Sequence, residues 1–109
     1  MLMTSSGPHM QLLTIVTRPR YERELGRFLR SGRAETFLPK LRAVLLYLQQ
    51  RKPLPISFRD HALKGRLKGL RECHIDYDLL LVYEIVEERL ELLLLRFCDH
   101  DELRKIAAR

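Results

Sequence analysis

Apolar residues recur along this chain with two different periods, and each change of period marks an element. The short β-branched run at residues 12–17 predicts a strand. Pro19 suits the first position of a helix, where its missing backbone N–H costs nothing. Helical spacing then connects four apolar residues: Tyr21, Leu25, Phe28 and Leu29. Gly32 is predicted to end that helix.

A second helix is predicted over residues 34–50, after a very short connection. Its apolar stripe comprises Phe37, Leu41, Val44, Leu45 and Leu48. The two helices would form a hairpin whose exposed face is rich in arginine. The residues concerned are Arg20, Arg23, Arg27, Arg30, Arg33 and Arg42. Such a face is usually solvated, although it could also contact RNA.

The rest of the chain follows a strand-rich pattern. Pro53 and Pro55 exclude helix and open an extended connector. Strands are predicted over residues 70–75, 79–85 and 90–97. Four glutamates mark the turn between the last two strands: Glu84, Glu87, Glu88 and Glu91. Asp99 is suited to cap a short helix after them.

The resulting order is β-α-α-β-β-β followed by a short helix. It predicts an α+β fold in which a helical hairpin packs on one face of a small, mainly antiparallel sheet. A length of 109 residues suits a single domain, which we expect to span residues 10–109. Residues 1–9 have no charged segment followed by an apolar stretch, so we read no signal peptide there. We expect them to be a tag or a disordered extension, with Met10 as the natural start.

Composition narrows the choice of partner. The formal net charge of +6 favours an anionic partner, of which nucleic acid is the commonest for a small basic domain. An acidic protein, or a surface that is merely basic, would also fit this charge. Cys73 and Cys98 lack a C-x-x-C spacing, so we expect reduced, apolar thiols in a cytoplasmic protein. No apolar run is long enough to span a bilayer, and no membrane association is expected.

Three of the four histidines fall where predicted strands begin or end: His61, His74 and His100. Short strands that pair side by side bring their ends together, so these imidazoles could converge. Cleavage of RNA without a metal needs a base for the 2′-OH, an acid for the 5′-oxygen and cations for the charged phosphorane. The imidazoles are candidates for the acid and the base, and Asp78 or Glu72 could orient one of them.

Cations surround these histidines in the sequence. The candidates for binding nucleic acid are Arg59, Lys64, Arg66, Lys68, Arg71 and Arg96. Gly65 and Gly69 lie among them and would let the backbone approach a phosphate chain closely. The alternative is a flexible, solvated loop.

The same residues also have ordinary structural interpretations. His61 could be a loop residue, His74 a strand-edge residue and His100 part of a helix cap. A metal site is conceivable among Glu72, Cys73, His74, Asp76, Asp78, Asp99 and His100. Their spacing matches no structural zinc pattern, and adjacent strand residues point to opposite faces. We therefore expect neither a metal ion nor another cofactor.

A longer motif runs through these positions. It reads Asp60-His61-Ala62-Leu63-Lys64-Gly65, then Lys68-Gly69, then Arg71-Glu72-Cys73-His74. Asp78 precedes the apolar run LLLVY, and Arg96 stands four residues before His100. With its opening LLTIVTRPRYEREL, the chain from Met10 onward resembles the YafQ branch of the RelE-like toxins of bacterial type II toxin–antitoxin systems, within the RelE/ParE superfamily. Glu72 stands where many relatives have Asp, and Leu103-Arg104 stands where many have an aromatic residue near the site.

The resemblance implies an antiparallel sheet flanked by helices and metal-independent cleavage of mRNA on the translating ribosome. It assigns catalytic roles to His61, His74, Asp78 and His100, with Glu72 as a fifth candidate. It also implies a toxin that is monomeric alone and hetero-oligomeric with a cognate antitoxin. Two alternatives remain: a ParE-like relative that binds a protein target without cleaving RNA, and an inactive RNA-binding module. The histidine set argues against the first, and the second requires that the titratable groups lie far apart.

Overall fold

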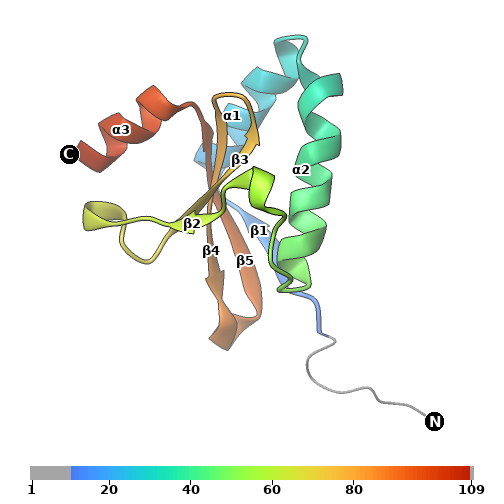
Figure 1. Ribbon diagram of the computed structural model, residues 1–109, viewed down its shortest axis with the longest axis vertical. Helices are drawn as coiled ribbons and strands as arrows, with labels where there is room; N and C mark the ends of the chain where they lie inside the picture. The colour runs from blue at the N-terminus through green and yellow to red at the C-terminus, as the bar shows by residue number, and fades with distance from the viewer. Residues whose placement is uncertain (1–10, 109) are drawn as a thin grey trace.

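The computed structural model describes residues 11–108, so the expectations for residues 1–9 and Met10 lie outside the described residues. Five strands and three α-helices follow one another along the chain (Figure 1). The first half holds β1 (Thr14–Thr17), α1 (Pro19–Arg30) and α2 (Ala34–Gln49). The second half holds β2 (His61–Ala62), β3 (Arg71–Asp76), β4 (Leu79–Val86), β5 (Glu91–Cys98) and α3 (His100–Ala108). Short 3₁₀ turns lie at η3 (Ile56–Phe58), η4 (Gly65–Leu67) and η5 (Glu87–Arg89).

The strands form one mixed sheet in the order β1-β5-β4-β3-β2. Three of its pairings are antiparallel, and β1 runs parallel to β5. The parallel pairing is possible because the two helices return the chain before the later strands begin. This is the predicted α+β architecture, with β2 as an additional strand. The pattern missed β2 because this strand has only two residues, both exposed, and so shows no apolar alternation.

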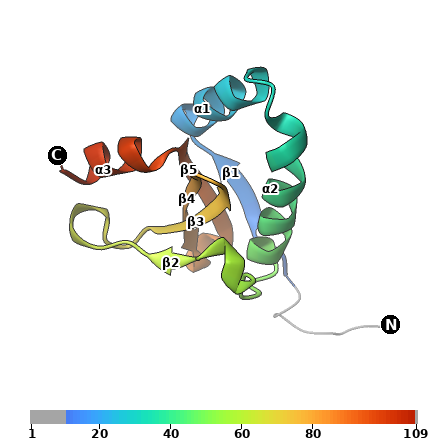
Figure 2. The same ribbon diagram turned by 45° about the horizontal axis from the view of Figure 1, so that its top comes forward.

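The sheet separates two layers. Helices α1 and α2 cover one face, while α3 and the loop containing η4 lie on the other side (Figure 2). Side chains of β4 alternate between these layers. Leu79, Leu81 and Tyr83 join the core under the two helices, whereas Leu80 and Val82 are buried outside that cluster. Both faces of β4 are therefore buried, which agrees with its continuous apolar run.

An aromatic cluster fixes the two long helices on β5. The ring of Phe97 is fully buried, and its centroid lies 5.5 Å from those of Phe28 and Phe37 and 6.0 Å from that of Tyr21. These contacts join one strand to both helices, so the predicted packing of the helices on the sheet is confirmed. No helix in the described part of the chain is long and apolar enough to cross a membrane.

The start of α3 matters for the site. Asp99 caps this helix as predicted, since its Oδ1 accepts a hydrogen bond from the backbone N–H of Glu102 at 2.8 Å. The cap makes His100 the first helical residue, directly after the end of β5. That residue therefore lies at the same end of the sheet as the turn between β3 and β4.

Candidate active site

The turn between β3 and β4 supplies the first part of the site. Asp78 takes the left-handed conformation with φ of 52°, which Asp tolerates better than most residues. Before it, the Oδ1 atom of Asp76 accepts hydrogen bonds from the backbone N–H of Tyr77 at 2.9 Å and from Lys40 Nζ at 3.1 Å. The hydrogen bond from the Tyr77 N–H, followed by that from Lys40, lowers the pKa of Asp76. The turn is thus held at Asp76, directly before Tyr77.

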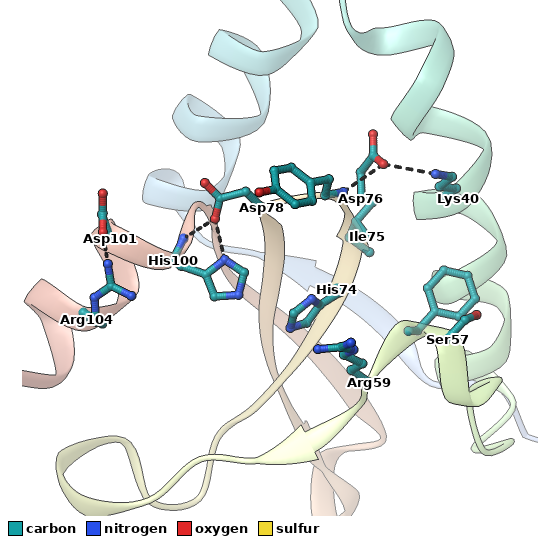
Figure 3. A pocket seen from close by; sticks show the side chains of 12 residues that line it. Lys40, Ser57, Arg59, His74, Ile75, Asp76, Asp78, His100, Asp101 and Arg104 are labelled. Carbon is teal, nitrogen blue, oxygen red and sulfur yellow. Dashed lines mark hydrogen bonds and ion pairs between the residues drawn. The ribbon is translucent and has the colours of Figure 1, made fainter.

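Asp78 and His100 form a carboxylate–imidazole pair. Asp78 Oδ1 accepts a hydrogen bond from the backbone N–H of His100 at 3.0 Å and contacts Nδ1 of its ring (Figure 3). The backbone bond, followed by the ring contact, lowers the pKa of Asp78. Because the ionised carboxylate can only accept, Nδ1 of His100 carries a proton and Nε2 is the ring atom available to a substrate.

His74 lies beside this pair. The ring centroids of His74 and His100 are 5.0 Å apart, and Figure 3 shows Arg59 next to His74. Burial lowers the pKa of His74; Glu72 opposes this shift, and His100, Arg59 and His61 add smaller contributions that lower the pKa further. His74 therefore stays neutral at pH values where an exposed histidine is already partly protonated.

Both rings line a cavity of about 690 Å³ between η3, the β3–β4 turn and α3. Its other lining residues are Lys40, Ser57, Phe58, Arg59, Ile75, Asp76, Tyr77, Asp78, Asp101 and Arg104. Cations and carboxylates therefore share its wall with the two imidazoles. An anionic substrate and a proton-transfer pair can both be accommodated here.

Glu72 connects His74 with His61. The Oε1 atom of Glu72 lies 3.4 Å from His61 Nε2 and 3.7 Å from His74 Nε2. The Glu72 side chain is only 6% exposed, and its Oε2 is buried without a hydrogen-bond partner among the described residues. His61 Nδ1 lies 2.7 Å from the carbonyl oxygen of Arg59, which can only accept, so this nitrogen carries a proton. An ion pair with Glu72 then forms when Nε2 is protonated as well.

A second polar cluster lies at the start of β3. Asp60 pairs with Arg71, with 2.9 Å between Oδ2 and a terminal guanidinium nitrogen, and also accepts a hydrogen bond from the Tyr83 hydroxyl. Burial, followed by the Asp60 carboxylate, raises the pKa of Tyr83 far above its usual value. Asp60 directly precedes His61, so this cluster helps to hold the short strand that carries it.

Arg96 points away from the cavity. Its Nε lies 3.0 Å from each carboxylate oxygen of Glu24, and one terminal nitrogen lies 2.6 Å from Oε2. Glu24 is 2% exposed and also accepts a hydrogen bond from the backbone N–H of Phe97 at 2.9 Å. This pair joins α1 to β5 inside the protein.

The other predicted cations are exposed. Lys64, Arg66 and Lys68 lie in the loop between β2 and β3, whose η4 turn lies against α3. None of the three lines the cavity, while Arg59 does. A strand of nucleic acid could reach them only by extending beyond the cavity along this loop.

The structure therefore brings together all five predicted catalytic residues in two linked groups. One group is His61, Glu72 and His74, and the other is Asp78 and His100. Sequence reasoning missed Lys40, Tyr77 and Arg104 as cavity residues. The sequence Asp76-Tyr77-Asp78 before β4 was the only local feature that could have indicated Tyr77 as a cavity residue. No feature of the sequence pattern indicated Lys40. Within residues 11–108, no group of three or more His, Cys, Asp or Glu side chains is arranged to hold a metal ion.

Comparison with known structures first defines the class. The chain superposes with a TM-score of 0.76 on a metal-bound toxin from Helicobacter pylori that is 39% identical in sequence. The match covers 84% of this chain and 99% of the toxin. The toxin-antitoxin complex of DinJ and YafQ from Escherichia coli contains a chain 25% identical, with a TM-score of 0.69 and coverage of 84% and 97%. The fold is thus that of the small RelE-like bacterial toxins.

The family follows from the sequence. Residues 13–105 match the family described as bacterial toxin of type II toxin-antitoxin system, YafQ, and the chain belongs to this family. The mRNA interferase toxin YafQ of Escherichia coli K12 is 36% identical over 45 residues. That alignment spans 41% of this chain and 49% of the relative, which is less than half of the relative's length.

Proposed function

We propose that this toxin is a ribosome-dependent endoribonuclease that cleaves mRNA without a metal ion and thereby inhibits translation. The observation that carries the proposal is the convergence of His74, His100 and Asp78 at one cavity. Two imidazoles 5.0 Å apart can serve the nucleophile and the leaving group of one phosphodiester. An inactive RNA-binding module would not need this arrangement.

The environments of the two histidines favour a division of roles. His74, whose pKa is lowered, is neutral and suited to take the proton of the 2′-OH. His100 is oriented by Asp78 through Nδ1, which leaves Nε2 suited to deliver a proton to the 5′-oxygen. The 2′-oxygen then attacks phosphorus, the bond from phosphorus to the 5′-oxygen breaks, and a 2′,3′-cyclic phosphate remains.

The remaining charge must be met by cations. Arg59 lines the cavity and can face the non-bridging phosphate oxygens, whereas Arg104 lines it as the exposed partner of Asp101. The exposed cations of the loop before β3 would follow the RNA backbone beyond the cavity. His61 and Glu72 would hold His74 in place, since Glu72 lies between both rings.

Partners follow from the same proposal. The substrate is mRNA in the ribosome, so we place the toxin in the cytoplasm. The E. coli complex pairs YafQ with DinJ, and we propose an equivalent antitoxin for this chain. The free toxin would be a monomer, and the antitoxin complex would be a hetero-oligomer.

The test is cleavage of mRNA on programmed ribosomes. Wild type should create new 3′ ends with a cyclic phosphate inside the A-site codon, and EDTA should not change the rate. His74→Ala and His100→Ala should each lower that rate by about 10²- to 10⁴-fold, the usual contribution of a general acid or base. Leu46→Ala, on the exposed face of α2, is the control and should cleave like wild type.

Two other results would contradict parts of the proposed function. Intact mRNA with wild type and both variants, despite ribosome binding, would contradict the nuclease and favour a protein target. Cleavage that EDTA abolishes and a divalent ion restores would contradict the metal-free route while keeping the nuclease.

A further inference from the structure

Tyr77 is an exposed aromatic residue at the rim of the candidate active site. Its side chain is 91% exposed, whereas Tyr21 and Tyr83 are buried. Tyr77 lines the same cavity as His74 and His100. Within residues 11–108, its ring takes part in no aromatic pair and its hydroxyl in no hydrogen bond. A large ring left out of the core at a polar cavity is available to a ligand.

The backbone that carries Tyr77 is held on both sides. Before it, Asp76 is bound by Lys40 and by the N–H of Tyr77 itself, at 3.1 and 2.9 Å. After it, Asp78 is bound to the backbone and ring of His100. The turn therefore presents the ring from a fixed position, directly next to the residue that orients His100.

The charges around Tyr77 indicate which part of a nucleotide would lie there. The flanking carboxylates of Asp76 and Asp78 repel a phosphate group. They can instead accept hydrogen bonds from the exocyclic amino groups of bases. Lys40 and Arg104 are paired with Asp76 and Asp101, so the cavity cation best suited to a phosphate is Arg59, which lies beside His74 rather than beside Tyr77 (Figure 3). The position of Tyr77 thus suits a base rather than a phosphate.

We propose that Tyr77 is a stacking platform for the base of a nucleotide next to the scissile phosphate. This rests on the proposed nuclease activity and adds a substrate-positioning residue to it. Bases of every kind have a π-face, so the ring contributes affinity with limited sequence preference. The stack exists before and during the reaction, so it should lower KM and leave kcat nearly unchanged.

The experiment combines protein and substrate changes. Tyr77→Ala should lower kcat/KM for mRNA on programmed ribosomes by roughly 5- to 150-fold, mainly through KM, which is the range for one base–aromatic stack. Tyr77→Phe and Tyr77→Trp keep a ring and should cleave within about 3-fold of wild type, because either ring supplies a π-face. Leu46→Ala, exposed elsewhere, serves as control, and equal urea midpoints show that each variant is folded.

Abasic nucleotides identify the stacked base. Removing the base at one position of the A-site codon should slow wild type as much as Tyr77→Ala does. The same removal should not slow Tyr77→Ala further, because the partner of the base is already missing. An equal effect of every abasic site on wild type and on Tyr77→Ala would overturn the proposal.

The proposed activity and the platform can fail separately. Cleavage by wild type with Tyr77→Ala within twofold of it would overturn the platform alone. An equal loss in Tyr77→Phe and Tyr77→Ala would also overturn it, since the hydroxyl rather than the ring would then matter. Failure of wild type to cleave would overturn the nuclease and the platform together.

Discussion

The pair of Arg96 and Glu24 tests whether a given cation of this protein stabilises the fold or binds RNA. Sequence reasoning assigned Arg96 to nucleic acid, yet its guanidinium is held by a carboxylate that is 2% exposed. The Arg96 side chain is itself only 16% exposed. The hydrogen bonds that Arg96 donates to Glu24, outweighing burial, raise the pKa of Arg96, so this guanidinium stays charged. We therefore expect Arg96→Met to impair folding stability rather than RNA affinity.

The magnitude follows from what the substitution leaves behind. Glu24 would remain buried as a carboxylate with the N–H of Phe97 as its nearest donor. Breaking one partner of a buried pair costs about 3–5 kcal/mol. Arg20 Nε lies 3.7 Å from Glu24 Oε2 and is mostly exposed, so it can move closer and offset part of the loss. We therefore expect a value near the lower end, about 3 kcal/mol.

Urea unfolding measures this change. With a slope of about 1–3 kcal/mol per molar urea, Arg96→Met should lower the midpoint by about 1–3 M. Cleavage per folded molecule should stay close to that of wild type. Lys68→Met is the matched control because it removes an exposed cation with the same replacement residue. It should leave the midpoint unchanged while weakening RNA binding in a salt-dependent way.

A double variant separates charge from packing. In Glu24→Gln with Arg96→Met, the amide oxygen can still accept from the N–H of Phe97 and no unpaired charge is buried. Its stability should return to within about 1–2 kcal/mol of wild type. An unchanged midpoint in Arg96→Met together with a tenfold loss of cleavage would refute the reasoning and return Arg96 to the RNA-binding set.

Three further predictions follow from buried groups. Because burial lowers the pKa of His74, the unfolded chain binds a proton at this residue at a higher pH than the folded protein does, so the free energy of unfolding should fall as pH drops below about 6.5. His74→Asn should weaken this dependence, which is measured as the change in urea midpoint between pH 7.5 and 5.5. Phe97→Ala should lower the unfolding free energy by about 3–5 kcal/mol in the same assay. Burial raises the pKa of Cys98 to about 12 and raises that of Cys73 even more. Neither thiol should therefore react with a thiol reagent until urea unfolds the protein. Rapid labelling of the native protein would contradict this prediction.

The elements that patterns predicted best are those with a clear local cause. Pro19 begins α1 and Asp99 caps α3, because both act through neighbouring backbone groups. The apolar run of β4 gave bounds within one residue of Leu79–Val86. The two-residue strand at His61 has no such cause, since only its pairing with β3 defines it. The parallel contact of β1 with β5 likewise depends on the whole topology.

The side chains of the site were likewise only partly predictable from the sequence. Motif spacing identified the histidines and Asp78, which the strand ends bring together. The roles of the cations depended on carboxylates far away in sequence, Asp60 for Arg71 and Glu24 for Arg96. A cation count along the chain cannot distinguish an arginine that faces RNA from one that is already paired. Only the packed structure supplies that difference.

Asp78 shows why the catalytic geometry and the fold are hard to separate here. One of its oxygens accepts both the backbone N–H that begins α3 and the ring N–H of His100. The first N–H groups of a helix lack partners within the helix, so this carboxylate completes the helix end. The left-handed backbone of the turn directs it there. The orientation of His100 is therefore set by the same contact that docks α3, before any substrate arrives. Under the proposed function, a site built in this way needs no rearrangement of Asp78 and His100 when RNA binds.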